Sequence, residues 1–137
     1  MREMGTDAIR RSVAVPKAIL VVDDDRHSRE GLLDALAHGG YDVDSAADPW
    51  QAINKIRERP FEVAIIDLDL PPIHGVSVGW DLVRIFRAYS PAIAIILVGA
   101  EQDAALQAQA RRLRVAEFLE KPISPTQVKA ILSQLGS

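Results

Sequence analysis

The chain contains no cysteine, so disulfides, thiolate nucleophiles and zinc–thiolate sites are all excluded. No apolar run approaches the length of about 18 residues that a membrane span needs. The first 16 residues also lack the apolar core of a secretory signal. The net charge of −3 argues against binding of nucleic acid through a basic face. We therefore expect a cytoplasmic protein that binds neither membranes nor nucleic acid through this domain.

The composition is typical of a globular protein. Hydrophobic residues make up 48% of the 137 residues and charged residues 26%, which is too apolar for a disordered chain. This length is enough for one domain with a substantial core and too short for two ordinary domains. We expect residues 17–136 to form the domain and residues 1–16 to be an N-terminal leader.

Apolar runs alternate with helical patterns along the chain. Residues 18–22, 63–66 and 92–98 are continuously apolar, as expected for parallel strands that are covered on both faces. Residues 41–46 and 116–120 alternate apolar with polar residues, so we place them at the sheet edges. Five β-α units predict an α/β fold, a doubly wound, flavodoxin-like (βα)5 domain with a five-stranded parallel sheet in the order 2-1-3-4-5.

The predicted strands end in residues that suit a cation and a phosphate group. These residues are Asp23 and Asp24 after the first strand, Asp67 after the third and Lys121 after the fifth. The same edge also receives Asp69 after the third strand and Gly99, Ala100 and Glu101 after the fourth. In this fold, ligands bind beyond the carboxyl ends of the strands. Clustered carboxylates suit Mg²⁺, which prefers oxygen ligands, and a lysine suits phosphate. The sequence thus predicts a site that neutralises a phosphoryl group during transfer.

The sequence resembles the receiver domain of two-component response regulators, as in the single-domain chemotaxis regulator. The resemblance covers residues 17–136 and rests on three motifs in the right order: "VVDDD", "IIDLDLP" and "EKP". It implies that a histidine kinase or phosphotransfer protein phosphorylates Asp67 and that the domain signals through protein–protein contacts. It further implies a monomer or weak dimer with an output protein that the sequence does not identify. Such a domain catalyses its own phosphorylation and dephosphorylation and is not an enzyme for a separate substrate.

The resemblance also implies a role for each remaining site residue. Asp24 would bind Mg²⁺ directly and Asp23 through water, with Asp67 and the backbone carbonyl of Asp69 as further ligands. Lys121 would pair with the phosphate, and its bond to Pro122 would be cis. Asp25 is left over, and we interpret it as the N-cap or a first-turn residue of the following helix.

Two features depart from the family pattern. Relatives carry Thr or Ser where this chain has Gly99, so the hydroxyl that contacts the phosphoryl oxygen is missing and the N–H of Ala100 remains for phosphate. The loop after the third strand also has about four more residues than in relatives, around Val76–Gly79. Gly75 or Gly79 is expected to start the next helix. The insertion is either a plain surface loop or a source of a replacement hydroxyl at Ser77.

Parts of the sequence also suggest two other functions. Gly99 is compatible with a pseudo-receiver, which has the same fold but serves as an interaction module without regulated phosphorylation. The "DLD" sequence after an apolar strand suggests a magnesium phosphatase of the haloacid dehalogenase type. That family has its aspartate pair on the first strand and a later acidic motif, whereas here the pair follows the third strand and residues 122–137 contain no acid.

Overall fold

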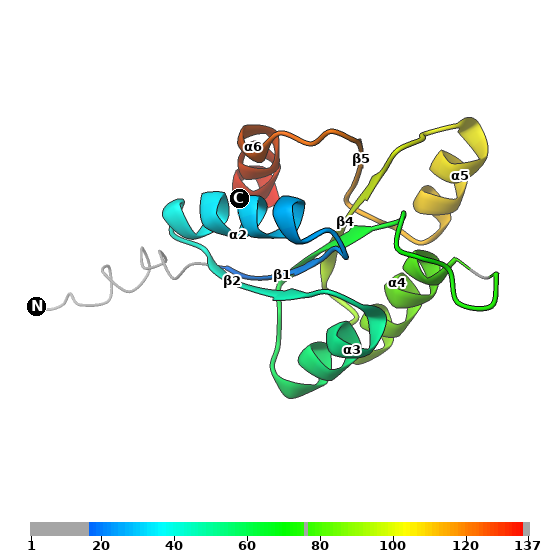
Figure 1. Ribbon diagram of the computed structural model, residues 1–137, viewed down its shortest axis with the longest axis horizontal. Coiled ribbons are helices and arrows are strands. Elements are labelled where there is room, and N and C mark those ends of the chain that lie inside the picture. Colours follow the sequence, from blue (N-terminus) through cyan, green and yellow to red (C-terminus); the bar gives the residue numbers. More distant parts are fainter. Residues whose placement is uncertain (1–16, 76, 136–137) are drawn as a thin grey trace, which may run out of the picture.

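A computed structural model describes residues 17–75 and 77–135 of the chain, and the expected leader, residues 1–16, lies outside the described residues. Five parallel strands form one sheet in the order β2-β1-β3-β4-β5 (Figure 1). This confirms the predicted topology. In chain order the elements are β1 (Ala18–Val22), α2 (Arg26–His38), β2 (Asp42–Ala46), α3 (Pro49–Glu58), β3 (Val63–Asp67), α4 (Val78–Tyr89), β4 (Ala94–Gly99), α5 (Ala104–Arg112), β5 (Glu117–Glu120) and α6 (Pro125–Leu135).

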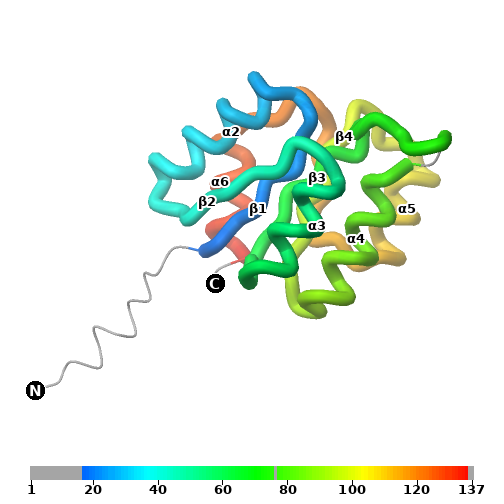
Figure 2. Tube along the Cα trace, turned by 60° about the horizontal axis from the view of Figure 1, so that its bottom comes forward, coloured from blue at the N-terminus to red at the C-terminus, as the bar shows by residue number. Residues whose placement is uncertain are grey.

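Helices cover both faces of the sheet. Helices α2 and α6 lie on one face, and α3 and α4 lie side by side on the other (Figures 1 and 2). The α3–α4 face also receives Ala110 of α5. No helix among the described residues has the length and apolar character needed to cross a membrane.

The three central strands are buried on both faces, as their continuous apolar sequences predict. In β1, Leu20 and Val22 pack toward α3 and α4, whereas Ile19 and Val21 pack toward α2 and α6. The strands β3 and β4 alternate in the same way. Side chains of successive strand residues point to opposite faces, so covering both faces requires apolar residues at every position.

The strand register places the predicted site residues at one edge of the sheet. Val22 of β1 pairs with Ile66 of β3, and Asp67 pairs with Val98 of β4. Gly99 in turn pairs with Glu120 of β5. The segments that carry Asp23–Asp25, Asp67–Asp69, Gly99–Ala100 and Lys121 therefore all emerge at the carboxyl edge, where the chain order of the strands reverses.

The other strands match their predicted ranges to within one residue, but the start of β4 and the start of α4 differ from the predictions. The strand expected over 92–98 is Ala94–Gly99, because the N–H of Ile93 bonds to the carbonyl of Ser90 at 3.0 Å in a turn before the strand. Helix α4 begins at Val78, so neither Gly75 nor Gly79 starts it. Its N-cap residue is Ser77, which is exposed and whose side chain makes no capping hydrogen bond.

Gly79 instead allows a close contact in the first turn of α4. A Cβ atom at this position would lie 2.8 Å from Cδ2 and 3.1 Å from Cα of Leu68. The helix therefore approaches the backbone directly after Asp67, at a separation that a larger residue would increase. Gly31, in the middle of α2, has no atom within 4 Å of a built Cβ.

Two matched glycine substitutions test this contact. Gly79→Ala is expected to lower the free energy of unfolding by about 1 kcal/mol, because the added methyl group overpacks the contact with Leu68. Gly31→Ala is expected to raise it by about 0.5 kcal/mol, because alanine has the higher helix propensity and the position is open. Urea unfolding of both variants measures the two effects. Equal stabilisation by the two substitutions would contradict the close approach of α4.

Candidate functional site

Three carboxylates meet at the carboxyl edge of the sheet. Asp23 and Asp24 follow β1, and Asp67 is the last residue of β3. Each offers one oxygen, and these oxygens all lie within 4.8 Å of one another. Asp67 is buried, with 4% of its surface exposed, whereas Asp23 is half-buried and Asp24 is exposed. Such a set of hard oxygen donors repels itself and suits a divalent cation.

Burial and repulsion both act on Asp23. They raise the pKa of its carboxyl group to about 6, with burial as the largest cause and the neighbouring Asp67 carboxylate as a further one. The N–H of Asp25 donates to Asp23 Oδ1 at 2.9 Å and opposes this shift. The raised pKa is therefore mainly the effect of burial on the charged form of Asp23, to which the Asp67 carboxylate adds repulsion.

Asp25, which follows Asp23 and Asp24 in the sequence, caps a helix and is not part of the carboxylate cluster. Its Oδ2 accepts a hydrogen bond from the N–H of Ser28 at 2.8 Å, which makes it the N-cap of α2. This bond also lowers the pKa of the Asp25 carboxyl group. The N-cap interpretation is therefore confirmed, and Asp25 helps to orient the helix that follows the site.

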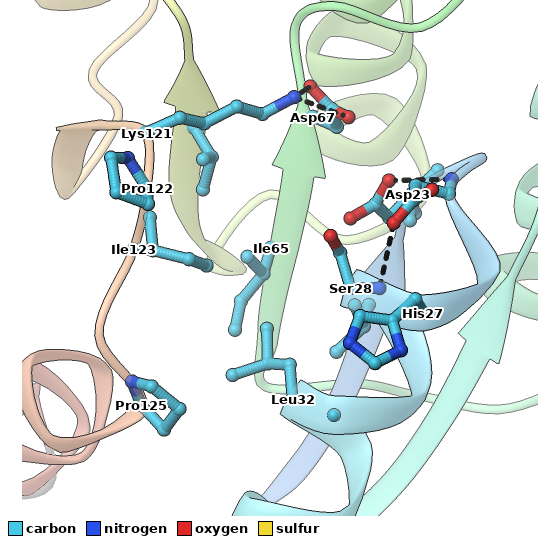
Figure 3. Close-up of a pocket in the computed structure, with 15 residues that line it drawn as sticks. Asp23, His27, Ser28, Leu32, Ile65, Asp67, Lys121, Pro122, Ile123 and Pro125 are labelled. Atoms are coloured by element: carbon cyan, nitrogen blue, oxygen red, sulfur yellow. Dashed lines mark hydrogen bonds and ion pairs between the residues drawn. The ribbon is translucent and has the colours of Figure 1, made fainter.

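Lys121 supplies the positive charge of the site. Its Nζ lies 3.0 Å from Asp67 Oδ1 and 3.1 Å from Asp67 Oδ2 (Figure 3). Burial lowers the pKa of the Lys121 ammonium, but hydrogen bonds and charge interactions with Asp67 and Asp69 outweigh it, and the pKa is raised overall. The Lys121 N–H bonds to the carbonyl of Gly99 at 2.9 Å, and the Lys121–Pro122 peptide is cis, as expected.

The Asp69 side chain has contacts that the sequence analysis missed. Its Oδ2 accepts a hydrogen bond from the N–H of Ala100 at 2.8 Å and lies 3.2 Å from Lys121 Nζ. Its own N–H donates to Asp67 Oδ1 at 2.8 Å. The resemblance to the family implies a role only for the backbone carbonyl of Asp69. The sequence signal for its side-chain contacts is an acidic residue two positions after Asp67, at the same sheet edge as Ala100.

Gly99 and Ala100 lie where the sequence predicts, at the end of β4. A Cβ atom built on Gly99 would lie 3.4 Å from Cε1 of Phe118 and 3.7 Å from Cβ of Leu68, which is ordinary van der Waals contact. The space would therefore accept a small side chain. Contacts of Gly99 and Ala100 with phosphate stay a prediction.

A pocket of about 610 Å³ adjoins the acidic cluster. Asp23, Asp67 and Lys121 lie at one end (Figure 3). The rest of the pocket runs between α2 and the segment before α6, and its apolar wall includes Leu32, Ile65, Pro122, Ile123 and Pro125. The charged residues therefore lie at one end of a mainly apolar pocket.

The raised pKa of Asp23 predicts a pH-dependent loss of stability. Asp23 binds its proton more tightly in the native state than in the unfolded state, where the pKa of its carboxyl group is near 3.8. The stability that comes from this tighter proton binding is therefore fully present below pH 3.8 and is lost as pH rises through about 6. Asp23→Asn, which cannot ionise, should be more stable than the native sequence at pH 7 without metal and should lose that advantage near pH 4.

Urea unfolding in a chelating buffer at the two pH values measures this difference. Asp34→Asn, an exposed change of equal charge in α2, is the control and should show no such pH-dependent gain. An Asp23→Asn advantage of the same size at pH 4 and pH 7 would show that ionisation of Asp23 is not its cause.

Comparisons with known proteins agree with this geometry. The family model for the response regulator receiver domain matches residues 19–133. The transcriptional regulatory protein ZraR of Escherichia coli O157:H7 is 30% identical over 117 residues, which are 85% of this chain and 25% of that protein. The chain thus spans about a quarter of the length of this curated relative.

Two further proteins are similar over most of the chain. The chemotaxis protein CheY of Thermotoga maritima is 26% identical over 121 residues, covering 88% of this chain and 98% of that protein. A crystal structure of a Burkholderia pseudomallei response regulator protein with a phosphorylated aspartic acid, calcium ion and citrate has a TM-score of 0.76. It is 24% identical, and the match covers 88% of this chain and 68% of that one. The chain therefore belongs to the response regulator receiver domain family.

Proposed function

We propose that this domain accepts a phosphoryl group on Asp67 in a Mg²⁺-dependent reaction. The observation that carries the proposal is that the Asp67 carboxylate is buried, paired with an ammonium and hydrogen-bonded. It is 4% exposed and is held by the Lys121 ammonium at 3.0 Å and by the N–H of Asp69 at 2.8 Å. Family membership and the phosphorylated aspartic acid in the Burkholderia pseudomallei protein support the assignment.

The proposed step is a nucleophilic displacement at phosphorus. A carboxylate oxygen of Asp67 forms a bond to the phosphorus atom of a phosphohistidine, and the P–N bond to the donor imidazole breaks. The imidazole nitrogen keeps the electron pair of that bond and takes up a proton from water. The product is an aspartyl phosphate, and Lys121 stands where it can offset the added negative charge.

The acidic cluster fits the metal that this function needs. Asp23, Asp24 and Asp67 provide oxygen donors only, within 4.8 Å of one another, and this donor set suits Mg²⁺ better than a soft metal. Burial and the neighbouring Asp67 carboxylate together raise the pKa of Asp23, and a bound cation would offset both effects. When bound, Mg²⁺ would supply neutralising charge, and the backbone carbonyl of Asp69 is proposed as a further ligand.

The proposed partners follow from the family. A sensor histidine kinase or a phosphotransfer protein would donate the phosphoryl group, and an output protein would read the phosphorylated state. The domain would catalyse changes at its own Asp67 and would not act as an enzyme on a separate substrate. The apolar pocket beside the site offers a surface for a donor protein to approach Asp67.

The pseudo-receiver is the second candidate because Gly99 cannot supply the usual hydroxyl. Against it, Asp23, Asp24 and Asp67 remain clustered, and Lys121 is paired with Asp67. A pseudo-receiver would have no chemical reason to keep a buried carboxylate in a repulsive cluster. The two candidates differ in one measurable property, which is covalent phosphorylation of Asp67.

Intact-mass spectrometry tests the phosphoacceptor. With Mg²⁺ and a small acyl phosphate, the native sequence should gain about 80 Da, the mass of one phosphoryl group. The gain should vanish in Asp67→Asn and persist in the control Asp34→Asn. A native protein that binds Mg²⁺ but gains no mass would favour the pseudo-receiver. Full labelling of Asp67→Asn would show that the acceptor is another residue.

Thermal unfolding tests the metal site. Mg²⁺ bound only by the folded state should raise the free energy of unfolding, by about 2.7 kcal/mol at a concentration 100 times the Kd. Asp24→Asn should reduce this gain because it removes a proposed direct ligand, whereas Asp34→Asn should leave it unchanged. A melting temperature that millimolar Mg²⁺ does not move would contradict the site.

A further inference from the structure

We propose that the Asp69 carboxylate is an internal competitor of the phosphoryl group. In the unphosphorylated protein it takes the hydrogen-bond donors that the phosphoryl group on Asp67 would need, and phosphorylation displaces it. This inference rests on the function proposed above. It assigns Asp69 a side-chain role in setting how readily Asp67 gains and keeps its phosphoryl group.

Two donors from different strands converge on one oxygen of Asp69. The N–H of Ala100, just after β4, donates to Asp69 Oδ2 at 2.8 Å. Lys121 Nζ, just after β5, lies 3.2 Å from the same oxygen. A backbone N–H and an ammonium that meet at one anionic oxygen form a small anion-binding cradle. In the described structure, the Asp69 carboxylate occupies that cradle.

The cradle has no spare donor for a second anion. An ammonium carries three protons, and Lys121 Nζ has three carboxylate oxygens within 3.2 Å: both oxygens of Asp67 and Oδ2 of Asp69. The single proton of the Ala100 N–H is also engaged. A phosphoryl oxygen that bonds to Ala100 or Lys121 must therefore replace a bond now made to a carboxylate. Repulsion between the phosphoryl group and Asp69 acts in the same direction.

The exposure of the Asp67 and Asp69 side chains indicates which carboxylate can move away from Lys121 when a phosphoryl group binds. The Asp67 side chain is 5% exposed, whereas that of Asp69 is 42% exposed. Asp69 lies in the segment between β3 and α4, so its side chain can turn into water and stay ionised without burying a charge. Asp67 keeps its place because its backbone is the end of a central strand.

Displacement of Asp69 would also act as a switch. The Asp69–Ala100 hydrogen bond ties the β3–α4 segment to the β4–α5 segment before phosphorylation. Its loss would free the β3–α4 segment, while Ala100 would bond to the phosphoryl group. The chain would thus couple the two segments to phosphorylation without a hydroxyl at Gly99. Because the phosphoryl group can make these contacts only after it arrives, it favours the displaced state differentially.

Beryllofluoride, a mimic of the phosphoryl group on aspartate, provides the test. The full chain is titrated with beryllofluoride at a Mg²⁺ concentration that saturates each protein, and the amide signal of Ala100 is followed by NMR. The proteins compared are the native sequence, Asp69→Asn, Asp69→Ala and the charge-matched control Asp34→Asn. Both Asp69 substitutions leave the Asp69 backbone carbonyl in place.

Both Asp69 variants are expected to bind beryllofluoride about fivefold more tightly than the native sequence, a modest factor because the contact is partly exposed to solvent. Asp34→Asn should bind like the native sequence. Without metal or beryllofluoride, the Ala100 amide proton should shift upfield in Asp69→Ala, because it loses a charged acceptor. This second signal does not depend on phosphorylation chemistry.

Each contrary outcome has a distinct meaning. Affinities of the Asp69 variants equal to that of the native sequence would overturn the competition and leave the phosphoacceptor function intact. Weaker binding by both variants would also overturn it and make Asp69 a residue that positions Lys121. If none of the four proteins binds beryllofluoride although all bind Mg²⁺, the proposed function itself fails, and the inference fails with it.

Discussion

The pairing of Asp67 with Lys121 is the interaction on which the site depends. A carboxylate that is 4% exposed is costly unless a counter-charge and hydrogen bonds replace the lost water. Lys121 supplies the charge, although its strand β5 is not a neighbour of β3, since β4 lies between them. The pair therefore forms only because the register of β3, β4 and β5 brings the ends of the strands level. Burial of the apolar strands fixes that register, so the hydrophobic core determines the electrostatics of the site.

One ammonium does not balance the negative charge gathered around it. Asp23, Asp24 and Asp67 lie together, and Asp69 Oδ2 lies 3.2 Å from the same Lys121 ammonium. Burial, and after it the neighbouring Asp67 carboxylate, raise the pKa of Asp23. The charged cluster therefore lowers the stability of the protein at the place where a bound cation would relieve the repulsion. A site that sacrifices stability in this way is expected where a ligand binds. The same excess makes Asp69 a competitor, because every anion in the site needs the same few donors.

The sequence predicts the fold and the members of the site well, for a physical reason. Continuously apolar strands can be stable only in the middle of a sheet covered on both faces, and parallel strands deliver their last residues to one edge. This places Asp23, Asp67 and Lys121 together without any knowledge of side-chain conformation. The expected cap at Asp25 was equally local and is confirmed by its bond to Ser28.

The features that the sequence analysis missed depend on three-dimensional packing. Helix α4 begins at Val78, and Gly79 lets its first turn approach Leu68 closely. The separation between this turn and Leu68 depends on how the two segments pack, which neither segment specifies alone. The contacts of the Asp69 carboxylate with Ala100 and Lys121 join three strand ends. A comparison of sequence motifs assigns a role to each residue separately, so it does not predict a contact that joins three strand ends.

On this proposal, a single anion cradle holds the Asp69 carboxylate before phosphorylation and the phosphoryl group afterwards. A crystal structure of the full chain with Mg²⁺ and beryllofluoride tests it most directly. We expect beryllofluoride on Asp67, with its fluorine atoms against Lys121 Nζ and the Ala100 N–H, and the Asp69 carboxylate turned into solvent. An adduct on Asp67 with Asp69 Oδ2 still bonded to Ala100, or an adduct on another carboxylate, would contradict it.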